Sequence, residues 1–403
     1  MKILIIGIGS PVPSFILRRI EALDKHGVNL IIVGDKSSKK QFKLHNSTLI
    51  TQPGLGLGSL GLWIRLLGTA LLNPYRFMRL LICFKYKGFI RGLYLALLHW
   101  TYVRCEGIGL IHLQWLSMGN DLSWLKKFFD VPIMASARGS QVTVYPEVRS
   151  GYREQIATSI CIVDQIHCLS NDIQQRCIQL GAHPKSTFVN YNGIDVEKFK
   201  PALKTTRDNK KGTVFRLITI GALMWRKGVH YQMLVLQKLL RRGLPVHLHV
   251  VGDGSDKEGL RYQSLRLGLV DAITWEGKCT EYEVIKLLQA SDLYLSTSVA
   301  EGLANVVVEA AACGLPVVAF DCEGMNEVIK PNVSGLIIEY GRVDLFVEAL
   351  DRLIRNDILR HEMGRAAREH ILQNFIEDRQ VESMIEKYQS LINEFQGSAK
   401  GTD

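Results

Sequence analysis

The stretch Glu301-Gly-Leu-Ala-Asn-Val-Val-Val-Glu309 decides the fold class of this 403-residue chain. The residues before it, Asp292-Leu-Tyr-Leu-Ser-Thr-Ser298, alternate in the manner of a strand that leaves a sheet. The residues after it, Ala310-Ala-Ala-Cys-Gly-Leu-Pro316, carry a helix to a glycine stop and a proline that cannot continue it. We therefore expect a strand, a turn and a helix, which is the repeating unit of a parallel α/β sheet.

The same stretch predicts a site for an anion flanked by hydroxyl groups. A helix that opens after such a turn aims backbone N–H groups at one point, where its dipole also favours negative charge. Glu301 stands at the mouth of the turn and Glu309 about one turn into the helix, so both carboxylates can face one pocket and accept hydrogen bonds from vicinal hydroxyls. A sugar joined to a nucleotide through a diphosphate has this chemistry. The residues expected to supply the N–H groups are Gly302, Leu303, Ala304 and Asn305.

The sequence of residues 301–318 closely resembles the signature of retaining glycosyltransferases of family four, which have the two-domain GT-B fold. The resemblance implies an α/β protein with two Rossmann-like, doubly wound domains that face a central cleft. It also implies that Glu309 holds the donor ribose and that Glu301 holds hydroxyls of the transferred sugar. An isolated pair of glutamates at this spacing would instead be read as two solvated charges near a buried helix.

A second motif, Gly221-Ala-Leu-Met-Trp-Arg-Lys-Gly228, follows an expected strand and precedes an expected helix. Two cations beside a glycine at such a turn suit a diphosphate, Arg226 by bidentate contact and Lys227 as a compact charge. The motif resembles the phosphate motif of the family, with Lys227 on the family lysine and Ala222 where the family has arginine. Arg226 can compensate for that arginine, and the alternative is a solvated basic turn.

The first half resembles the family more weakly. Asn192 begins an Asn-Gly-Ile-Asp run that lies at the interdomain cleft in the family, although a plain Asn-Gly turn is physically adequate. Gly9 follows the first strand, near the reacting sugar in the family, and Ser14 ends a loop that resembles the first loop of exopolysaccharide-building members. Arg138 and Gln141 take the places of a family histidine and aspartate, so an arginine could hold the developing phosphate charge there.

The length of the chain predicts two domains. We expect an N-terminal acceptor-binding domain over residues 1–200 and a polar linker over 201–213. A C-terminal nucleotide-sugar-binding domain is expected over 214–375, followed by a helix that can cross back to the first domain and a tail over 376–403. The strands expected from short apolar runs are 2–7, 28–33, 130–136, 165–170, 215–221, 246–252, 273–276, 292–296, 316–320 and 335–338, with a helix expected over 14–26.

The first 200 residues carry a charge of +12, from 24 Lys and Arg against 12 Asp and Glu, whereas the remaining residues carry −2, which gives the net charge of +10. Residues 36–105 contain no acidic residue, and their cations alternate with runs rich in Leu, Trp and Phe that are too short to span a bilayer. Such a segment suits the interface of an anionic membrane. The alternative is that these apolar faces pack onto the first domain, because periodicity does not distinguish core from interface.

These features lead to one interpretation with two alternatives. The favoured one is a retaining, metal-independent hexosyltransferase that moves a sugar from a nucleotide-sugar to a saccharide acceptor, most plausibly lipid-linked, in cell-surface polysaccharide synthesis. A glycosidase, or a non-catalytic nucleotide-sugar-binding protein at a membrane, is the alternative. No Asp-x-Asp occurs, no cofactor or nucleic acid is expected, and eight scattered cysteines favour a reducing compartment, hence the cytoplasmic membrane face.

Overall fold

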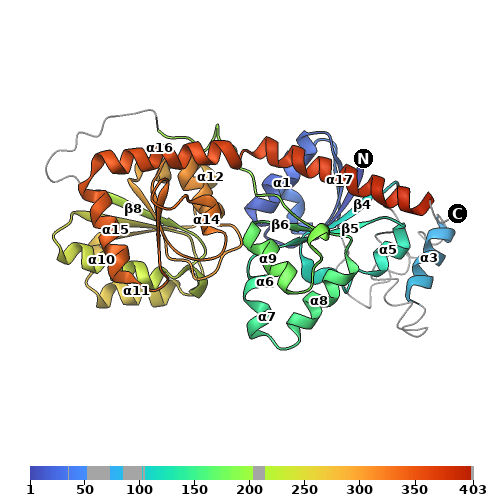
Figure 1. The fold of residues 1–403 in the computed structure, drawn as a ribbon, viewed down its shortest axis with the longest axis horizontal. Coiled ribbons are helices and arrows are strands. Elements are labelled where there is room, and N and C mark those ends of the chain that lie inside the picture. Colours follow the sequence, from blue (N-terminus) through green and yellow to red (C-terminus); the bar gives the residue numbers. More distant parts are fainter. Residues whose placement is uncertain (35, 52–72, 85–101, 103–104, 203–213, 401–403) are drawn as a thin grey trace. The chain divides into compact units, whose positions relative to one another are not determined.

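The computed structural model describes residues 1–34, 36–51, 73–84, 102, 105–202 and 214–400 (Figure 1). The chain divides into two compact units. Unit 1 comprises Met1–Cys168, Gln174–Asn190 and Val381–Asp403, and unit 2 comprises Leu169–Ile173 and Tyr191–Gln380. Most of the expected linker and the last three residues of the tail lie outside the described residues.

Unit 1 contains a parallel sheet of seven strands. They are β1 (Lys2–Ile8), β2 (Asn29–Gly34), β3 (Thr48–Thr51), β4 (Leu110–Leu113), β5 (Ile133–Ala137), β6 (Gln165–Cys168) and β7 (Thr187–Val189). Their order across the sheet is β3-β2-β1-β4-β5-β6-β7, and every pair is parallel. The order reverses between β1 and β4, which is where ligands of doubly wound sheets bind.

Helices cover this sheet. They are α1 (Ser14–Lys25), α3 (Pro74–Phe84), α5 (Trp124–Phe129), α6 (Ser140–Thr143), α7 (Tyr145–Val148), α8 (Tyr152–Ile162), α9 (Asn171–Gln179) and α17 (Glu377–Lys400). Figure 1 shows α1 and α17 along one face, where Ile16 and Ile20 from α1 share a core with Met384 and Tyr388 from α17. The spacing of four residues within each pair places both side chains on one helical face.

Unit 2 contains a parallel sheet of six strands, which are β8 (Phe215–Ile220), β9 (Val246–Val251), β10 (Ile273–Gly277), β11 (Leu293–Ser296), β12 (Val317–Phe320) and β13 (Gly335–Ile338). The order is β10-β9-β8-β11-β12-β13, with all pairs parallel. Adjacent strand residues face opposite cores, as Leu217 and Ile218 do, so both faces of this sheet are buried. Sheets of this kind consist of apolar runs rather than polar–apolar alternation.

The helices of unit 2 are α10 (Val229–Arg241), α11 (Lys257–Arg266), α12 (Glu281–Ala290), α13 (Asn305–Ala312), α14 (Met325–Val328), α15 (Val343–Arg355) and α16 (Asp357–Asn374). Residues of α10, α11 and α15 bury one face of the sheet, and residues of α12, α13, α14 and α16 bury the other. Short 3-10 helices span Lys36–Gln41, Leu116–Met118, Pro184–Ser186, Trp225–Lys227 and Val270–Ala272.

The fold class predicted from the sequence is confirmed, since both units are doubly wound parallel sheets covered by helices. All six strands of unit 2 lie within a residue or so of the expected ranges. In unit 1 the predictions missed β3, β4 and β7, which contain only four, four and three residues.

The basic apolar segment is described only in part. Its apolar runs around residues 62–72 and 93–101 lie outside the described residues, whereas α3 is described. Leu80 and Phe84 of α3 are buried, but Tyr75, Met78 and Ile82 are 75%, 55% and 56% exposed. Among the helices of the described ranges, none combines the length and the apolar character needed to cross a bilayer.

Candidate functional site

Two loops of unit 2 leave the sheet at the point where its strand order reverses. β8 ends at Ile220 and leads into the Gly221–Gly228 motif, while the adjacent strand β11 ends at Ser296 and leads into Glu301. Both predicted donor motifs therefore lie at the carboxyl ends of neighbouring strands, at the position that binds ligands in such sheets. A pocket at this edge is lined by residues from both loops, among them Gly221, Lys227 and Ser298.

Hydrogen bonds tie the two loops together. The Thr297 hydroxyl donates to the carbonyl oxygens of Gly228 at 2.9 Å and Lys227 at 3.2 Å, and the Val299 N–H donates to the Arg226 carbonyl at 2.7 Å. Gly228 has φ +59°, and a Cβ atom there would lie 2.1 Å from the Thr297 carbonyl oxygen. Glycine is needed at this position for the left-handed backbone and for the close approach of the two loops.

The loops bring Lys227 and Glu301 into contact. Lys227 Nζ donates to Glu301 Oε1 at 2.5 Å, and their side chains are 19% and 11% exposed. The Ser298 hydroxyl donates to the same oxygen at 2.8 Å. A Cβ at Gly221 would lie 3.1 Å from Lys227 Cε, so the lysine stem runs close over the glycine backbone. A cation and a carboxylate are thus held together at the mouth of the strand–turn–helix unit.

Glu309 lies on α13 and is 6% exposed. Burial raises the pKa of Tyr294 well above its usual range, and the negative charges of Glu309 and Glu301 raise it further. Burial also raises the pKa of the Cys313 thiol to about 12, with an additional contribution from Glu309. Both carboxylates therefore lie near enough to Tyr294 of β11 for their charges to raise its pKa.

The backbone donors at the start of α13 differ from the expectation in one respect. The N–H of Asn305 donates to the carbonyl oxygen of Leu303 at 2.9 Å, so it is already engaged. No group of the described chain accepts a hydrogen bond from the N–H of Gly302, Leu303 or Ala304. Three donors rather than four thus remain at this helix start for an anionic ligand.

Two further predicted residues lie in unit 2. Asn192 is 6% exposed, and its side-chain amide donates to Asn305 Oδ1 at 3.1 Å, so it borders the start of α13. Arg226 is half-buried, with its guanidinium against the sulfur of Met224 at 3.4 Å. Ala222, which stands where the related motif has arginine, is exposed.

The other predicted residues lie in unit 1. Gly9 and Ser14 are exposed between β1 and the first turn of α1. Arg138 follows β5 and is 4% exposed; its guanidinium donates to the carbonyl and the side-chain oxygen of Gln114, at 2.9 Å each, and lies over the ring of Phe15. Burial lowers the pKa of Arg138 to about 9, assisted by the positive charge of Arg19.

The site also contains residues that the motifs did not indicate. Thr297 binds the two motifs to each other, Ser298 donates to Glu301, and Gln232 donates to Thr297 Oγ1 and to Thr219 Oγ1, at 3.0 Å each. These are small polar residues that any loop could carry. Only knowledge that β8 and β11 are neighbours in the sheet could have indicated these residues.

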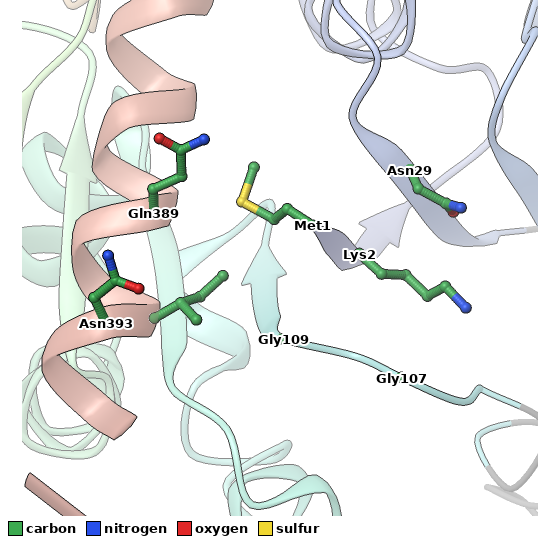
Figure 2. A pocket seen from close by; sticks show the side chains of 8 residues that line it. Met1, Lys2, Asn29, Gly107, Gly109, Gln389 and Asn393 are labelled. Atoms are coloured by element: carbon green, nitrogen blue, oxygen red, sulfur yellow. The ribbon is translucent and has the colours of Figure 1, made fainter. Parts of the chain in front are cut away.

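A larger cavity lies elsewhere, at the amino-terminal ends of the strands of unit 1 (Figure 2). It has a volume of about 640 Å³, and Figure 2 shows around it Met1, which precedes β1, Lys2 from β1, Asn29 from β2, and Gln389 and Asn393 from α17. None of the predicted site residues lines it. In the described residues no cluster of three or more His, Cys, Asp or Glu side chains suits a metal ion.

Comparison with known proteins associates these features with one family. Residues 204–370 match the family model described as glycosyl transferases group 1. The chain is 28% identical over 238 residues to the UDP-Gal:alpha-D-GlcNAc-diphosphoundecaprenol alpha-1,3-galactosyltransferase of Escherichia coli, covering 56% of this chain and 60% of that protein. It is also 28% identical to the lipopolysaccharide 1,6-galactosyltransferase of Salmonella typhimurium, covering 50% and 55%. The chain thus spans little more than half the length of these relatives.

Solved structures share the fold over almost the whole chain. Anabaena Alr3699/HepE in complex with UDP and glucose superposes with a TM-score of 0.73 at 20% identity, covering 97% of this chain and all of that one. Sucrose-phosphate synthase from Thermosynechococcus elongatus superposes with a TM-score of 0.78 at 15% identity, covering 98% and 99%. The fold is therefore GT-B.

Proposed function

We propose that this chain, whose residues 204–370 match the family model of group 1 glycosyl transferases, transfers a sugar from a nucleotide-sugar to a saccharide acceptor with retention of the anomeric configuration. The observation that carries the proposal is the pairing of Lys227 with Glu301 beside the start of α13, at the reversal point of a doubly wound sheet. Cation, carboxylate and backbone donors in one place match the diphosphate and hydroxyl groups of such a donor.

Each group has a role in this proposal. The N–H groups of Gly302, Leu303 and Ala304 and the ammonium of Lys227 bind the diphosphate, and Arg226 supports them. Glu309 accepts hydrogen bonds from the ribose, and Glu301 accepts them from the transferred sugar. As the bond between the anomeric carbon and the phosphate oxygen breaks, negative charge grows on the leaving diphosphate, and fixed donors aimed at that charge lower the barrier.

The chemistry needs no protein nucleophile. The bond from the anomeric carbon to the acceptor oxygen forms on the face that the leaving group vacates, and the acceptor proton passes to a diphosphate oxygen. A nucleoside diphosphate and an α-linked product result from an α-linked donor. Because the sequence contains no Asp-x-Asp, we propose that this step is metal-independent and expect chelators to leave turnover largely unchanged.

We propose a lipid-linked saccharide as the acceptor, bound by unit 1 at the cytoplasmic face of an anionic membrane. The similarity to the Escherichia coli diphosphoundecaprenol galactosyltransferase supports a lipid-linked acceptor. The exposed residues Tyr75, Met78 and Ile82 of α3, with the exposed cation Lys127 on the neighbouring helix α5, support a membrane surface. A helix with this face suits the interface rather than the interior of a bilayer.

A mass-spectrometric screen of UDP-glucose, UDP-galactose and GDP-mannose against lipid-linked saccharides tests the proposal. We expect one donor to yield an acceptor enlarged by one hexose and an equal amount of nucleoside diphosphate. Release of free sugar from a saccharide without any nucleotide would indicate a glycosidase instead. Donor binding without turnover on any acceptor would indicate a non-catalytic binding protein.

A further inference from the structure

Ser298 contacts the proposed sugar-binding carboxylate. It lies three residues before Glu301 in the loop after β11, and it is 3% exposed. Its hydroxyl donates to Glu301 Oε1 at 2.8 Å, and this is the oxygen that also accepts from Lys227 Nζ at 2.5 Å. Two donors thus converge on one carboxylate oxygen of a side chain that is 11% exposed.

The other oxygen of Glu301 is left for a ligand. Within the described part of the chain no group donates a hydrogen bond to Oε2. A carboxylate can accept about four hydrogen bonds, two on each oxygen. Because Oε1 is held by two donors, the carboxylate is restrained, and Oε2 keeps its accepting capacity beside Lys227 and Ser298, which both line the pocket.

The backbone around Ser298 is fixed as well. The preceding residue, Thr297, is fully buried and donates to the carbonyl oxygen of Gly228, while accepting from Gln232 Nε2 at 3.0 Å. The following residue, Val299, donates its N–H to the Arg226 carbonyl at 2.7 Å. A hydroxyl held on both sides in this way can orient its acceptor rather than follow it.

We infer that Ser298 is a positioning residue of the proposed site, which fixes Glu301 so that Oε2 meets a hydroxyl of the transferred sugar. The inference rests on the proposed function and deepens it. It separates two parts of donor recognition. Ser298 acts on the sugar through Glu301, whereas the nucleoside diphosphate is bound by Lys227, Glu309 and the start of α13 without it.

Calorimetric titration with UDP and with UDP-glucose, and in parallel with GDP and GDP-mannose, tests this separation. The quantity of interest is the Kd of the nucleoside diphosphate divided by the Kd of the corresponding nucleotide-sugar. For Ser298→Ala we expect this ratio to fall by about 3- to 10-fold, the range spanned by one hydrogen bond of typical net strength, while the Kd of the nucleoside diphosphate stays constant. Ser264→Ala is the matched control, because Ser264 is also buried in unit 2 but donates to the carbonyl of Arg261 on α11.

A double-mutant cycle then distinguishes positioning from a general effect on the loop. In a Glu301→Ala background, Ser298→Ala should leave the ratio unchanged, since the group on which it acts is gone. Ser298→Cys, which keeps a weak donor of similar size, should give an intermediate ratio and serves if the alanine variant does not fold. An equal further fall of the ratio in the Glu301→Ala background would overturn the inference.

The result for the unmodified protein keeps the two levels apart. If the unmodified protein binds a nucleotide-sugar more tightly than the nucleoside diphosphate and Ser298→Ala shows the same ratio of Kd values, only the positioning role of Ser298 is wrong. If the unmodified protein gains no affinity from either sugar, the role of Ser298 is contradicted, and if it binds none of these nucleotides, the proposed function is contradicted with it.

Discussion

At the scale of single residues, the ion pair of Lys227 and Glu301 links the two predicted motifs. Both side chains are largely withdrawn from water, at 19% and 11% exposed, so removal of either one leaves a mostly buried charge without its partner. The sequence indicated both residues, each from its own motif, but nothing in the spacing of 74 positions between them shows that they touch. Their contact follows from the pairing of β8 with β11, which is a property of the whole sheet.

Substitution of Lys227 should affect catalysis more than folding. For Lys227→Ala we expect kcat/KM to fall by two to three orders of magnitude, because a donor aimed at developing charge contributes about 3–4 kcal/mol. Steady-state kinetics with the active donor, at matched thermal stability, is the measurement. Lys286→Ala, which removes an exposed cation of α12, is the control. Near-full kcat/KM in Lys227→Ala would exclude a role at the diphosphate.

Substitution of Glu309 should weaken the binding of the nucleotide itself. Loss of the hydrogen bonds from the ribose to a buried carboxylate should cost about 1.5–3 kcal/mol of binding free energy in Glu309→Ala. Calorimetry with UDP and GDP, without a sugar, measures this directly. Glu362→Ala, at an exposed position of α16, should bind as the unmodified protein does. Equal nucleotide affinity in both variants would remove Glu309 from the site.

At the scale of elements, the apolar runs of the sequence predicted the strands well where the runs are long and buried on both sides. All strands of unit 2 were expected, because all but β10 (Ile-Thr-Trp-Glu-Gly) consist of four to six mostly apolar residues. β4 has only four residues and was missed, and the structure buries its His112 fully between Tyr388 and Ser136. A buried polar network of this kind depends on partners such as Tyr388, 276 positions away, which no local pattern indicates.

The close approach of the loops that follow β8 and β11 gives a prediction for Gly228. In Gly228→Ala the new Cβ would meet the Thr297 carbonyl at 2.1 Å, so the loops must separate. Gly268→Ala is a matched control in the same unit, because Gly268 has φ +69° but no atom within 4 Å of a Cβ. Both variants should lose about 1–2 kcal/mol from the left-handed backbone.

Only Gly228→Ala should also lower donor affinity, by tenfold or more. Thermal denaturation and calorimetry on the two variants separate the two effects. Equal donor affinity in both variants would mean that the close approach of the loops has no part in binding.

At the scale of the whole molecule, helix α3 shows why the sequence left two interpretations of the basic apolar segment open, a membrane interface or packing onto the first domain. Its periodicity predicted an apolar face, and the structure divides that apolar content between a buried pair, Leu80 and Phe84, and an exposed set, Tyr75, Met78 and Ile82. Packing against α5 decides which face of α3 is buried, because the ring centroids of Phe84 and Trp124 lie 5.0 Å apart. Sequence alone gives the two faces but not their surroundings.

Binding to anionic vesicles should therefore depend on α3 and on salt. We expect the protein to float with anionic vesicles at low ionic strength and less so at high ionic strength, because each Lys or Arg near the surface contributes about 1 kcal/mol that salt screens. Replacing Met78 and Ile82 together by serine should reduce flotation at low salt. Ile358→Ser, at a 73% exposed apolar position of α16, should not. Indifference of the unmodified protein to anionic vesicles at low salt would contradict the membrane proposal.

Proton NMR of the reaction with an α-linked donor shows whether the chain transfers a sugar from a nucleotide-sugar with retention. We expect the donor signal to be replaced by equal amounts of nucleoside diphosphate and an α-linked product. An unpaired release of free sugar, or a β-linked product from the same α-linked donor, would contradict it.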